Sequence, residues 1–580
     1  MMKQLVLLLF LQSCTLIISA QVDLFYEDNK SLTYEETIAA FELLASKYKS
    51  AELKTAGSTD SGLPLHLFVI DTDGDFNPAR ARQRNKRVLL VNNGIHPGEP
   101  CGIDASIEWA QQLLSSNDPL LKNTVVLIIP VYNVGGMLNR GCCFRANQDG
   151  PEMHGFRGNA KNLDLNRDFI KCDSRNARSF NAMFQQWNPD VFVDTHTTNG
   201  ADYSYTMTLI APNSGKMYSL LGAITDRELV PFLYSRMEEL GYPMAPYVST
   251  RKGTPESGIM HYPDSPRYSS GYANLFHALS FTAEAHMLKP FSERVKATKA
   301  LLQALLEMTS QRGEIIAQLR AKAAEYTSQS REVELNHRVD TTQYDVFRFA
   351  GYEVEYRTSK VTGTEQRHYN TGKPYVKDVP WYRTLEPQLT VSLPEYYIIP
   401  QAWTEVVELL RLNGVQVKEL RSDTELSVNV MYIADYQSSP RPYEGHYLHR
   451  DVQVRQEQKK LPFRAGDFVI KTNQPTNQYL AHVLDPRSED GFFCWNFFDA
   501  ILMQKEYFSP YLFDAEAERL LEEDPELKAR FLAKKKDPEF ASDVWQQLDF
   551  IYRRSKWYEP THNRYPVVGF NGTFPDNLVR

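Results

Sequence analysis

The chain has 580 residues, which is too long for one ordinary hydrophobic core, so we expect several domains. Hydrophobic residues make up 42% of it and charged residues 23%, which is typical of a globular protein and excludes a disordered one. The formal net charge is −8 and no basic cluster stands out, so we expect no nucleic-acid partner. After the N-terminus no apolar run reaches about eighteen residues, so no transmembrane span is expected.

Residues 1–20 have the pattern of a Sec signal peptide, with an early lysine, a long apolar stretch and small residues at its end. We therefore expect an exported protein that is periplasmic or secreted. Cys14 gives a loose likeness to a lipoprotein box, but the apolar stretch continues past it, so lipid anchoring is the less favoured alternative.

Removal of this segment would leave Cys101, Cys142, Cys143, Cys172 and Cys494. An odd number of cysteines in an exported chain of this length makes disulfides optional and not the framework of the fold. A bridge from Cys142 or Cys143 to Cys172 is the pairing that we consider, although the sequence alone does not decide it.

Between residues 30 and 300, strand-like patterns alternate with helical ones. A capping box at Thr33–Glu36 starts a helix, and further helices are expected at Ile103–Leu114, Phe180–Trp187 and about Ser292–Gln329. Strands are expected at Leu65–Ile70, Val88–Val91, Thr124–Val131, Asp190–Asp194 and Leu279–Thr282. This alternation predicts an α/β domain over residues 21–325, with a mixed, largely parallel sheet flanked by helices.

Beyond residue 330 the sequence changes to short alternating strands, many tyrosines and Pro-rich turns. Ser427–Asp435 alternates with a period of two, and Asp514–Lys535 has the pattern of one charged helix. We interpret residues 326–580 as an accessory α+β region of one or two domains whose role is open. Two patterned segments, Tyr443–His446 and Cys494–Asp499, suggest no chemistry, and we expect them to pack inside this region.

A buried strand and the turn after it present two candidate metal ligands. The apolar run Val88–Val91 ends at Asn92–Gly94, and His96 and Glu99 follow within a few residues. This pattern is typical of a central parallel strand that ends at the carboxyl edge of a sheet, where α/β proteins place their ligand sites. His196 follows another apolar strand and would be the third ligand. Two histidines and one glutamate suit zinc and leave a fourth position open for water.

A zinc-activated water needs a base, and an anionic substrate needs a cationic partner. Glu284 stands at the end of another apolar strand and could face the metal, although a buried ion pair is the alternative role. Asn166 and Arg167 place an amide beside a guanidinium, and such a fork can hold a carboxylate by two parallel hydrogen bonds. An ion pair of Arg167 with Asp164 is the competing interpretation.

Together these motifs resemble the zinc carboxypeptidase family M14 over about residues 30–300. The resemblance rests, in chain order, on His96-Pro-Gly-Glu99, Asp164-Leu-Asn166-Arg167, Asp194-Thr-His196 and Glu284. It implies that one Zn²⁺ is bound by His96, Glu99 and His196. It further implies that Glu284 is the general base and later proton donor, and that Asn166 and Arg167 hold the terminal carboxylate of a peptide.

The resemblance implies two further residues that are harder to place. For the arginine that stabilises the oxyanion, Arg157 fits best and Arg145 is the alternative. For the tyrosine that caps the substrate, Tyr268 is favoured over Tyr272. The residue that sets the side-chain preference of the pocket does not transfer from the family.

We therefore expect an exported zinc metallocarboxypeptidase that hydrolyses C-terminal residues from peptides with a free terminal carboxylate. An alternative is a zinc deacylase or amidase of the aspartoacylase type, because Thr197 and Thr198 follow the third ligand. A carboxypeptidase for peptidoglycan stem peptides is a narrower form of the first hypothesis. A non-enzymatic hypothesis is a polymer-binding module on an inactive peptidase fold, but every catalytic position is filled, which argues against it.

Overall fold

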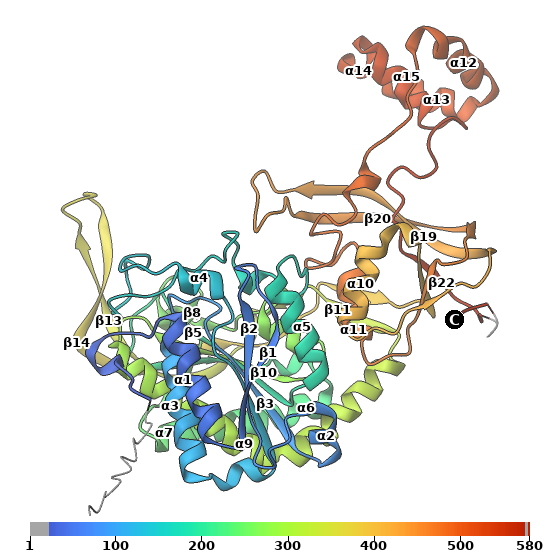
Figure 1. Ribbon diagram of the computed structural model, residues 1–580. Coiled ribbons are helices and arrows are strands. Elements are labelled where there is room, and N and C mark those ends of the chain that lie inside the picture. The colour runs from blue at the N-terminus through green and yellow to red at the C-terminus, as the bar shows by residue number, and fades with distance from the viewer. Residues whose placement is uncertain (1–21, 575–577) are drawn as a thin grey trace, which may run out of the picture.

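The computed structural model describes residues 22–574 and 578–580, so the predicted signal peptide at residues 1–20 lies outside the described residues. An N-terminal domain, which ends with a long helix at residue 329, lies next to the accessory region (Figure 1). A long hairpin and a group of helices project from the rest of the chain (Figure 1). None of the helices in the described residues has the length and apolar character that a membrane crossing needs.

The N-terminal domain is built on a mixed sheet. Its strands, in spatial order, are β1 (Ala51–Ser58), β2 (Pro64–Ile70), β4 (Thr124–Ile129), β3 (Arg87–Asn92), β5 (Val191–Thr198), β10 (Leu279–His286), β6 (Met207–Ile210) and β7 (Met244–Pro246). The central strands β4, β3, β5 and β10 run parallel, whereas β1, β2 and β6 each have an antiparallel neighbour. This arrangement confirms the predicted α/β fold with a mixed, largely parallel sheet.

Helices cover both faces of this sheet. They are α1 (Tyr34–Lys47), α2 (Pro78–Gln83), α3 (Cys101–Ser116), α4 (Val134–Leu138), α5 (Arg175–Trp187), α6 (Ser219–Ile224), α7 (Val230–Glu239), α8 (Ser269–Asn274) and α9 (Phe291–Gln329). The predicted capping box is present at α1, where the Thr33 hydroxyl accepts a hydrogen bond from the Glu36 amide and the Glu36 carboxylate accepts one from the Thr33 amide.

Strand β3 shows why its residues form a central strand. Leu89 and Val91 pack on one face with side chains of α1, α3 and α9. Val88 and Leu90 alternate with them and pack on the opposite face with side chains of α5. Because successive side chains of a strand point to opposite faces, a run of four apolar residues satisfies a sheet covered on both sides. Full burial of each such side chain contributes about 1.5–3 kcal/mol.

Part of the chain beyond α9 returns to the N-terminal domain. The hairpin of β13 (Asp345–Thr358) and β14 (Glu365–Tyr382) pairs through β14 with β9 (Ile259–Met260), which pairs with β8 (Ser249–Thr250). Two small pairings accompany it, β11 (Glu332–Leu335) with β16 (Leu389–Ser392) and β12 (Arg338–Val339) with β15 (Leu385–Glu386). Residues after 330 contact the first domain through β14 and also at Gly351, which forms an isolated bridge with Tyr203.

The accessory region has its own antiparallel sheet. In spatial order its strands are β18 (Lys418–Glu419), β21 (Phe468–Lys471), β17 (Tyr396–Ile399), β22 (Val568–Phe570), β19 (Thr424–Ser438) and β20 (His449–Phe463), with α10 (Thr404–Leu412) and α11 (Asn477–Leu484) beside them. Short helical turns complete the described chain at η1 (Tyr26–Asp28), η2 (Pro119–Lys122), η3 (Leu165–Arg167), η4 (Ser214–Lys216), η5 (Thr225–Leu229), η6 (Pro255–Ser257), η7 (Gln401–Trp403) and η8 (Asp499–Leu502).

Two predictions need correction. The single charged helix expected at Asp514–Lys535 is two helices, α12 (Pro510–Glu523) and α13 (Pro525–Lys534), because Pro525 begins a new helix whose first turn is capped by the Asp524 side chain. The projecting helical group is completed by α14 (Pro538–Ser542) and α15 (Val544–Tyr552). The disulfide considered with Cys172 is also wrong, since Cys142 is bonded to Cys143 and Cys172 is free and buried.

Candidate metal centre and substrate pocket

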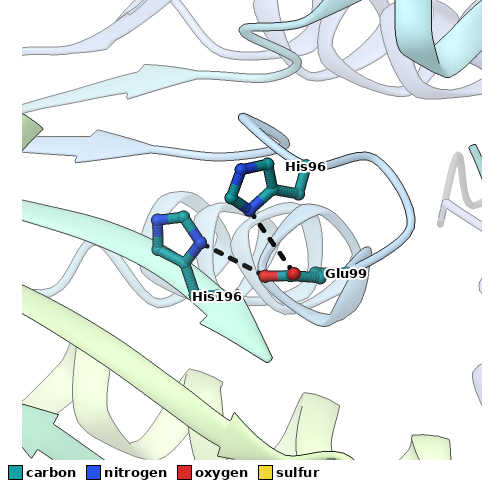
Figure 2. A group of neighbouring side chains, drawn as sticks. All are labelled: His96, Glu99 and His196. Carbon is teal, nitrogen blue, oxygen red and sulfur yellow. Dashed lines mark hydrogen bonds and ion pairs between the residues drawn. The ribbon is translucent and has the colours of Figure 1, made fainter. Parts of the chain in front are cut away.

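His96, Glu99 and His196 converge on one point in the N-terminal domain. Their ligand atoms all lie within 4.8 Å of one another, and all three side chains are buried. The Nδ1 atom of His96 lies 3.4 Å from one Glu99 oxygen, and the Nδ1 atom of His196 lies 3.2 Å from the other. Figure 2 shows the two imidazole rings facing the carboxylate from different elements.

The backbone turn after β3 positions His96 and Glu99, the first two predicted ligands. Strand β3 ends at Asn92, and Gly94 adopts a φ of 66°, which a residue with a side chain rarely does. A tight turn follows, closed by a hydrogen bond from the Glu99 amide to the His96 carbonyl at 2.8 Å. Gly98 allows a close approach there, since an added Cβ would lie 2.9 Å from the Arg145 side chain and 3.1 Å from the Gly155 carbonyl oxygen.

The parallel strands β5 and β10 set the relation between the third ligand and the predicted base. His196 and Glu284 are direct neighbours in the register of these strands. Paired residues on adjacent strands project to the same face of a sheet, so the two side chains lie on one side at the carboxyl ends of both strands. The predicted third ligand and the predicted base are therefore held together by sheet hydrogen bonds.

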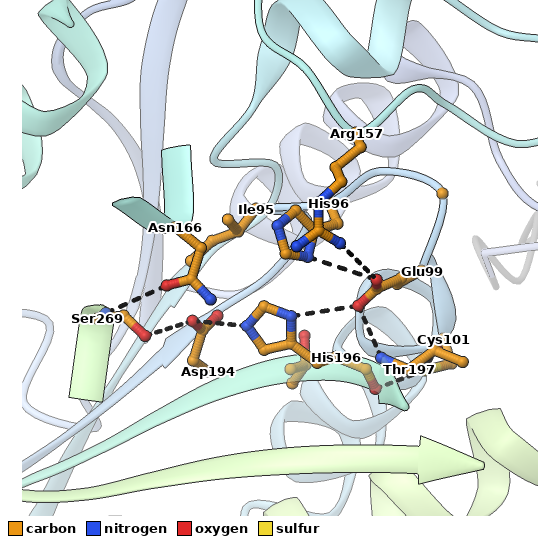
Figure 3. A network of polar contacts seen from close by, with 12 residues as sticks. Ile95, His96, Glu99, Cys101, Arg157, Asn166, Asp194, His196, Thr197 and Ser269 are labelled. Atoms are coloured by element: carbon orange, nitrogen blue, oxygen red, sulfur yellow. Dashed lines mark hydrogen bonds and ion pairs between the residues drawn. The ribbon is translucent and has the colours of Figure 1, made fainter. Parts of the chain in front are cut away.

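Second carboxylates orient both histidines. The Nε2 atom of His96 lies 2.9 Å from Asp164, and the Nε2 atom of His196 lies 2.9 Å from Asp194. The hydroxyl of Ser269 in turn donates to Asp194 (Figure 3). Contacts of this kind favour the tautomer with a proton on Nε2, which leaves Nδ1 of each ring available to a metal. Carboxylates fix the rings of metal-binding histidines in the same way.

The donor set fits a zinc ion. Two imidazole nitrogens and one carboxylate suit Zn²⁺, and the Nδ1 atom of His96 is buried without a hydrogen-bond partner. Burial by itself would raise the pKa of Glu99, but Arg145 and both histidines hold it well below its usual range. Burial would likewise lower the pKa of His196, yet Asp194 and Glu99 raise it well above the ordinary value. One divalent cation would contact the Glu99 carboxylate and the Nδ1 atoms of both histidines together, and it requires the neutral form of each ring.

The structure brings every predicted site residue to one cavity of about 300 Å³. The predicted residues that line it are His96, Glu99, Arg157, Asn166, Arg167, His196, Tyr268 and Glu284. Burial raises the pKa of Glu284 to about 8. Of the two candidate tyrosines, Tyr268 lines the cavity, whereas Tyr272 is fully buried and donates its hydroxyl to Asn413. One cavity thus holds all of these residues, and their individual roles stay predictions.

Both candidate arginines reach the cavity, by different contacts. Arg157 pairs with Asp164 at 2.9 Å and lies 3.6 Å from Glu99, with 46% of its side chain exposed (Figure 3). Arg145 donates to Glu99 at 2.7 Å and to the Thr197 carbonyl at 3.3 Å, with 19% of its side chain exposed. Arg145 is thus the more buried of the two and the closer to Glu99.

Asn166 and Arg167 lie on the short helical turn η3. Asp164 caps this turn by accepting a hydrogen bond from the Asn166 amide. The side-chain oxygen of Asn166 accepts a hydrogen bond from the Ser269 amide at 3.2 Å, which leaves its NH₂ group free for another acceptor (Figure 3). The Arg167 guanidinium lies over the Tyr268 ring, 4.6 Å from its centroid. It is 3.8 Å from Asp164, so the competing ion-pair interpretation describes only a long contact.

Sequence reasoning missed several groups at this site. Tyr247, Tyr262 and Thr282 line the cavity, and Tyr443 of the accessory region contacts Arg167. The tyrosines lie in stretches without strong periodicity. Tyr443 is more than 270 residues away from Arg167 along the chain, so no local pattern could have connected them.

Comparisons with known proteins agree with the geometry. Residues 37–243 match the family model described as zinc carboxypeptidase, Peptidase_M14. The chain is 21% identical over 434 residues to Carboxypeptidase 2 of Trichophyton equinum, a match that covers 70% of this chain and 73% of that protein. It is 25% identical over 258 residues to Inactive metallocarboxypeptidase ecm14 of Schizosaccharomyces pombe, covering 38% and 51%. A solved structure of a metallo-carboxypeptidase from Burkholderia cenocepacia is similar with 16% identity and a TM-score of 0.35, covering 48% of this chain and 70% of that chain.

Proposed function

We propose that this chain, a peptide hydrolase whose N-terminal domain belongs to the zinc carboxypeptidase family M14, removes single residues from the free C-termini of peptides. The observation that carries this proposal is the cavity lined by a buried His-Glu-His group, a partly buried glutamate and an Asn-Arg pair. A metal group alone would suit many hydrolases. The Asn-Arg pair adds recognition of a carboxylate, which selects a chain end.

In this mechanism Asn166 and Arg167 bind the terminal carboxylate and so place the last peptide bond next to the metal ligands. A zinc ion held by His96, Glu99 and His196 would polarise the scissile carbonyl and activate the attacking water. Glu284 accepts the proton of that water and later donates it to the departing amine. The raised pKa of Glu284, about 8, suits a group that must both take up and release a proton near neutral pH.

An arginine and a tyrosine complete the proposed site. An arginine stabilises negative charge on the carbonyl oxygen, for which Arg157 and Arg145 are both within reach of Glu99. Tyr268 lies over Arg167 and can cover the bound end of the peptide. All of these groups come from the N-terminal domain.

The decisive experiment uses two matched peptide mixtures, one with free C-termini and one with amidated C-termini. The zinc-loaded chain is incubated with each, and the products are identified by mass spectrometry. We expect single-residue losses from the free C-termini and none from the amidated peptides, because an amide lacks the anion that Arg167 binds. Internal cleavage, or equal cleavage of both mixtures, would contradict an exopeptidase.

The comparisons do not favour the aspartoacylase-type alternative, since the relatives named above are Carboxypeptidase 2 and an inactive metallocarboxypeptidase. Stem peptides of peptidoglycan with free C-termini can be added to the same mixture as a separate arm. Export is proposed from residues 1–20 alone, and N-terminal sequencing of the mature protein tests it. A mature chain that begins at or near Gln21 is expected, and an intact N-terminus would contradict cleavage.

A further inference from the structure

The connection between β19 and β20 leaves the accessory region and reaches the first domain. We call residues 439–448 the tip segment, since β19 ends at Ser438 and β20 begins at His449. In Figure 1 this hairpin extends from the accessory sheet toward the N-terminal domain. The expectation that Tyr443–His446 packs inside the accessory region is wrong, because its side chains contact residues 164–173 of the first domain.

A tight turn at the end of the tip segment presents these side chains. The amide of Tyr443 donates to the His446 carbonyl at 2.7 Å, and the amide of His446 donates to the Tyr443 carbonyl at 3.0 Å. The two central residues, Glu444 and Gly445, have φ values of 49° and 84°. Turns of this kind favour Asn, Asp or Gly at both positions, so Glu444 is an unusual residue there. The contact of its carboxylate with the Asp164 amide can account for a glutamate at this position.

Three hydrogen bonds join the tip segment to the region around η3. Glu444 accepts a hydrogen bond from the Asp164 amide at 2.6 Å, and the Tyr443 hydroxyl accepts one from Arg167 Nε at 2.8 Å. His446 Nε2 lies 2.7 Å from a carboxylate oxygen of Asp173. The first two contacts are made to residues that flank or form the predicted carboxylate site. The contact of His446 is made to Asp173, which lies six residues after Arg167 in the same segment of the first domain.

The buried ring of Trp495 packs against this turn. Trp495 is fully buried in the accessory region, with its ring stacked 6.3 Å from Tyr443 and edge-on at 5.5 Å from His446. Lys171 and Arg267 of the first domain lie over the same indole ring at 5.3 Å and 5.1 Å. The other patterned segment that had no assigned role, Cys494–Asp499, therefore lies at this domain contact.

The contact at Nε matters for the chemistry of Arg167. A carboxylate is held best by two parallel N–H groups of one guanidinium plane. In Arg167 the Nε atom donates to Tyr443 and the Nη1 atom donates to the Asn166 carbonyl, while the Tyr268 ring lies against the plane. These contacts fix the orientation of the plane and leave N–H groups of Nη1 and Nη2 for a ligand. A guanidinium held in this way loses less side-chain freedom when the substrate binds.

We infer that two residues of the tip segment serve substrate binding: Tyr443 positions Arg167 for the terminal carboxylate, and Glu444 anchors Tyr443. Arg167 lines the cavity, and the Tyr443 hydroxyl accepts a hydrogen bond from its Nε atom. Tyr443 is therefore a positioning residue that acts through Arg167. The inference rests on the proposed carboxypeptidase function, because it requires a terminal carboxylate as the group that Arg167 binds.

The test uses the full chain loaded with zinc and a peptide with a free C-terminus. Tyr443→Phe removes one hydroxyl and keeps the ring against Trp495. We expect KM to rise about tenfold with kcat within about twofold of wild type, since a hydrogen bond to a charged group is lost from binding only. Tyr447→Phe is the matched control, because Tyr447 lies in the same segment with 53% of its surface exposed, and it should leave both constants unchanged.

Two further variants separate positioning from folding. Arg167→Gln should raise KM more than Tyr443→Phe, and adding Tyr443→Phe to it should cause no further rise, because the partner of the hydroxyl is gone. Glu444→Gly removes the anchor on Asp164 but suits the backbone of the turn, so a smaller rise in KM is expected. Melting temperature and zinc content are measured for each variant.

The outcomes are distinguishable. If wild type and Arg167→Gln differ in KM while Tyr443→Phe and Glu444→Gly match wild type, the positioning role is overturned and the proposed function stands. Equal effects of Tyr443→Phe in the wild-type and Arg167→Gln backgrounds would also overturn it, since the hydroxyl would act by another route. If the wild-type chain releases no residue from any free C-terminus, the proposed function fails and this inference fails with it.

Discussion

The two ends of the cavity are built in different ways. At the metal end, His196 and Glu284 are paired neighbours in the parallel sheet, and His96 and Glu99 follow directly from the end of β3. At the carboxylate end, Arg167 lies on an irregular segment that is held by hydrogen bonds from the accessory region. In the proposed mechanism the chemical step therefore uses residues of one domain, whereas recognition of the chain end also uses contacts from the accessory region.

The largest effect is expected from removing a metal ligand. His196→Ala takes away one of three ligands and one of the contacts of the buried Glu99, so zinc binding and turnover should both be lost. Metal content after dialysis and peptide release measure the two effects. Tyr443→Phe serves as the control from the other end of the cavity and should retain a full equivalent of zinc. Loss of zinc from both variants would contradict the view that the metal end is built independently of the carboxylate end.

Removal of the base should affect only the chemical step. Glu284→Gln keeps the shape of the side chain in the sheet but cannot accept a proton, so kcat should fall about 10²–10⁴-fold while zinc content and KM stay near wild type. Steady-state kinetics and metal analysis check this prediction. A variant with wild-type turnover would show that another group takes the proton.

The two arginines can be separated by a matched pair of variants. Loss of a group that stabilises the oxyanion typically lowers kcat by about 10²–10³-fold. Arg145 is the more buried and is closer to Glu99, so we expect Arg145→Gln to lower kcat more than Arg157→Gln. Arg157→Gln should act mainly through Asp164, its 2.9 Å partner. The reverse order of effects would favour Arg157, the residue preferred from the sequence.

A dependence on pH is also expected, and it concerns the metal end alone. Although burial opposes it, the charges of Asp194 and Glu99 raise the pKa of His196 above its ordinary value. Zinc requires the neutral ring, so its affinity is greatest above that pKa and falls about tenfold for each pH unit below it. Titration of zinc binding between pH 8 and 5 measures this slope. Asp194→Asn lowers the pKa and should shift the loss of affinity to lower pH, and an unchanged profile would contradict the link.

Local patterns were enough to predict the sheet and the metal end. The run Val88–Val91 predicted a strand covered on both faces, and the strand ends placed His96, Glu99 and His196 where the structure brings them together. The helix break at Pro525 was also readable from local chemistry, but the charged pattern on both sides of it suggested one continuous helix. In each case the information lies within a few residues of the feature.

Two other features, the choice of arginine and the disulfide pairing, could not be predicted from neighbouring residues in the sequence. The choice between Arg145 and Arg157 depends on how an irregular segment folds over the metal ligands, and irregular segments have no periodicity to interpret. The bond between Cys142 and Cys143 excludes the pairing with Cys172, because each cysteine can form one bridge. Such choices are made by contacts between segments.

By itself the sequence determined the α/β fold, the strand ends and the residue types of a zinc centre, because hydrophobic periodicity and turn residues act over short distances along the chain. Only the tertiary structure decided that the turn at Tyr443–His446 meets Arg167 and Asp164. That contact joins residues more than 270 positions apart, and it exists because the burial of Trp495 at the domain contact brings the tip segment to the end of the cavity.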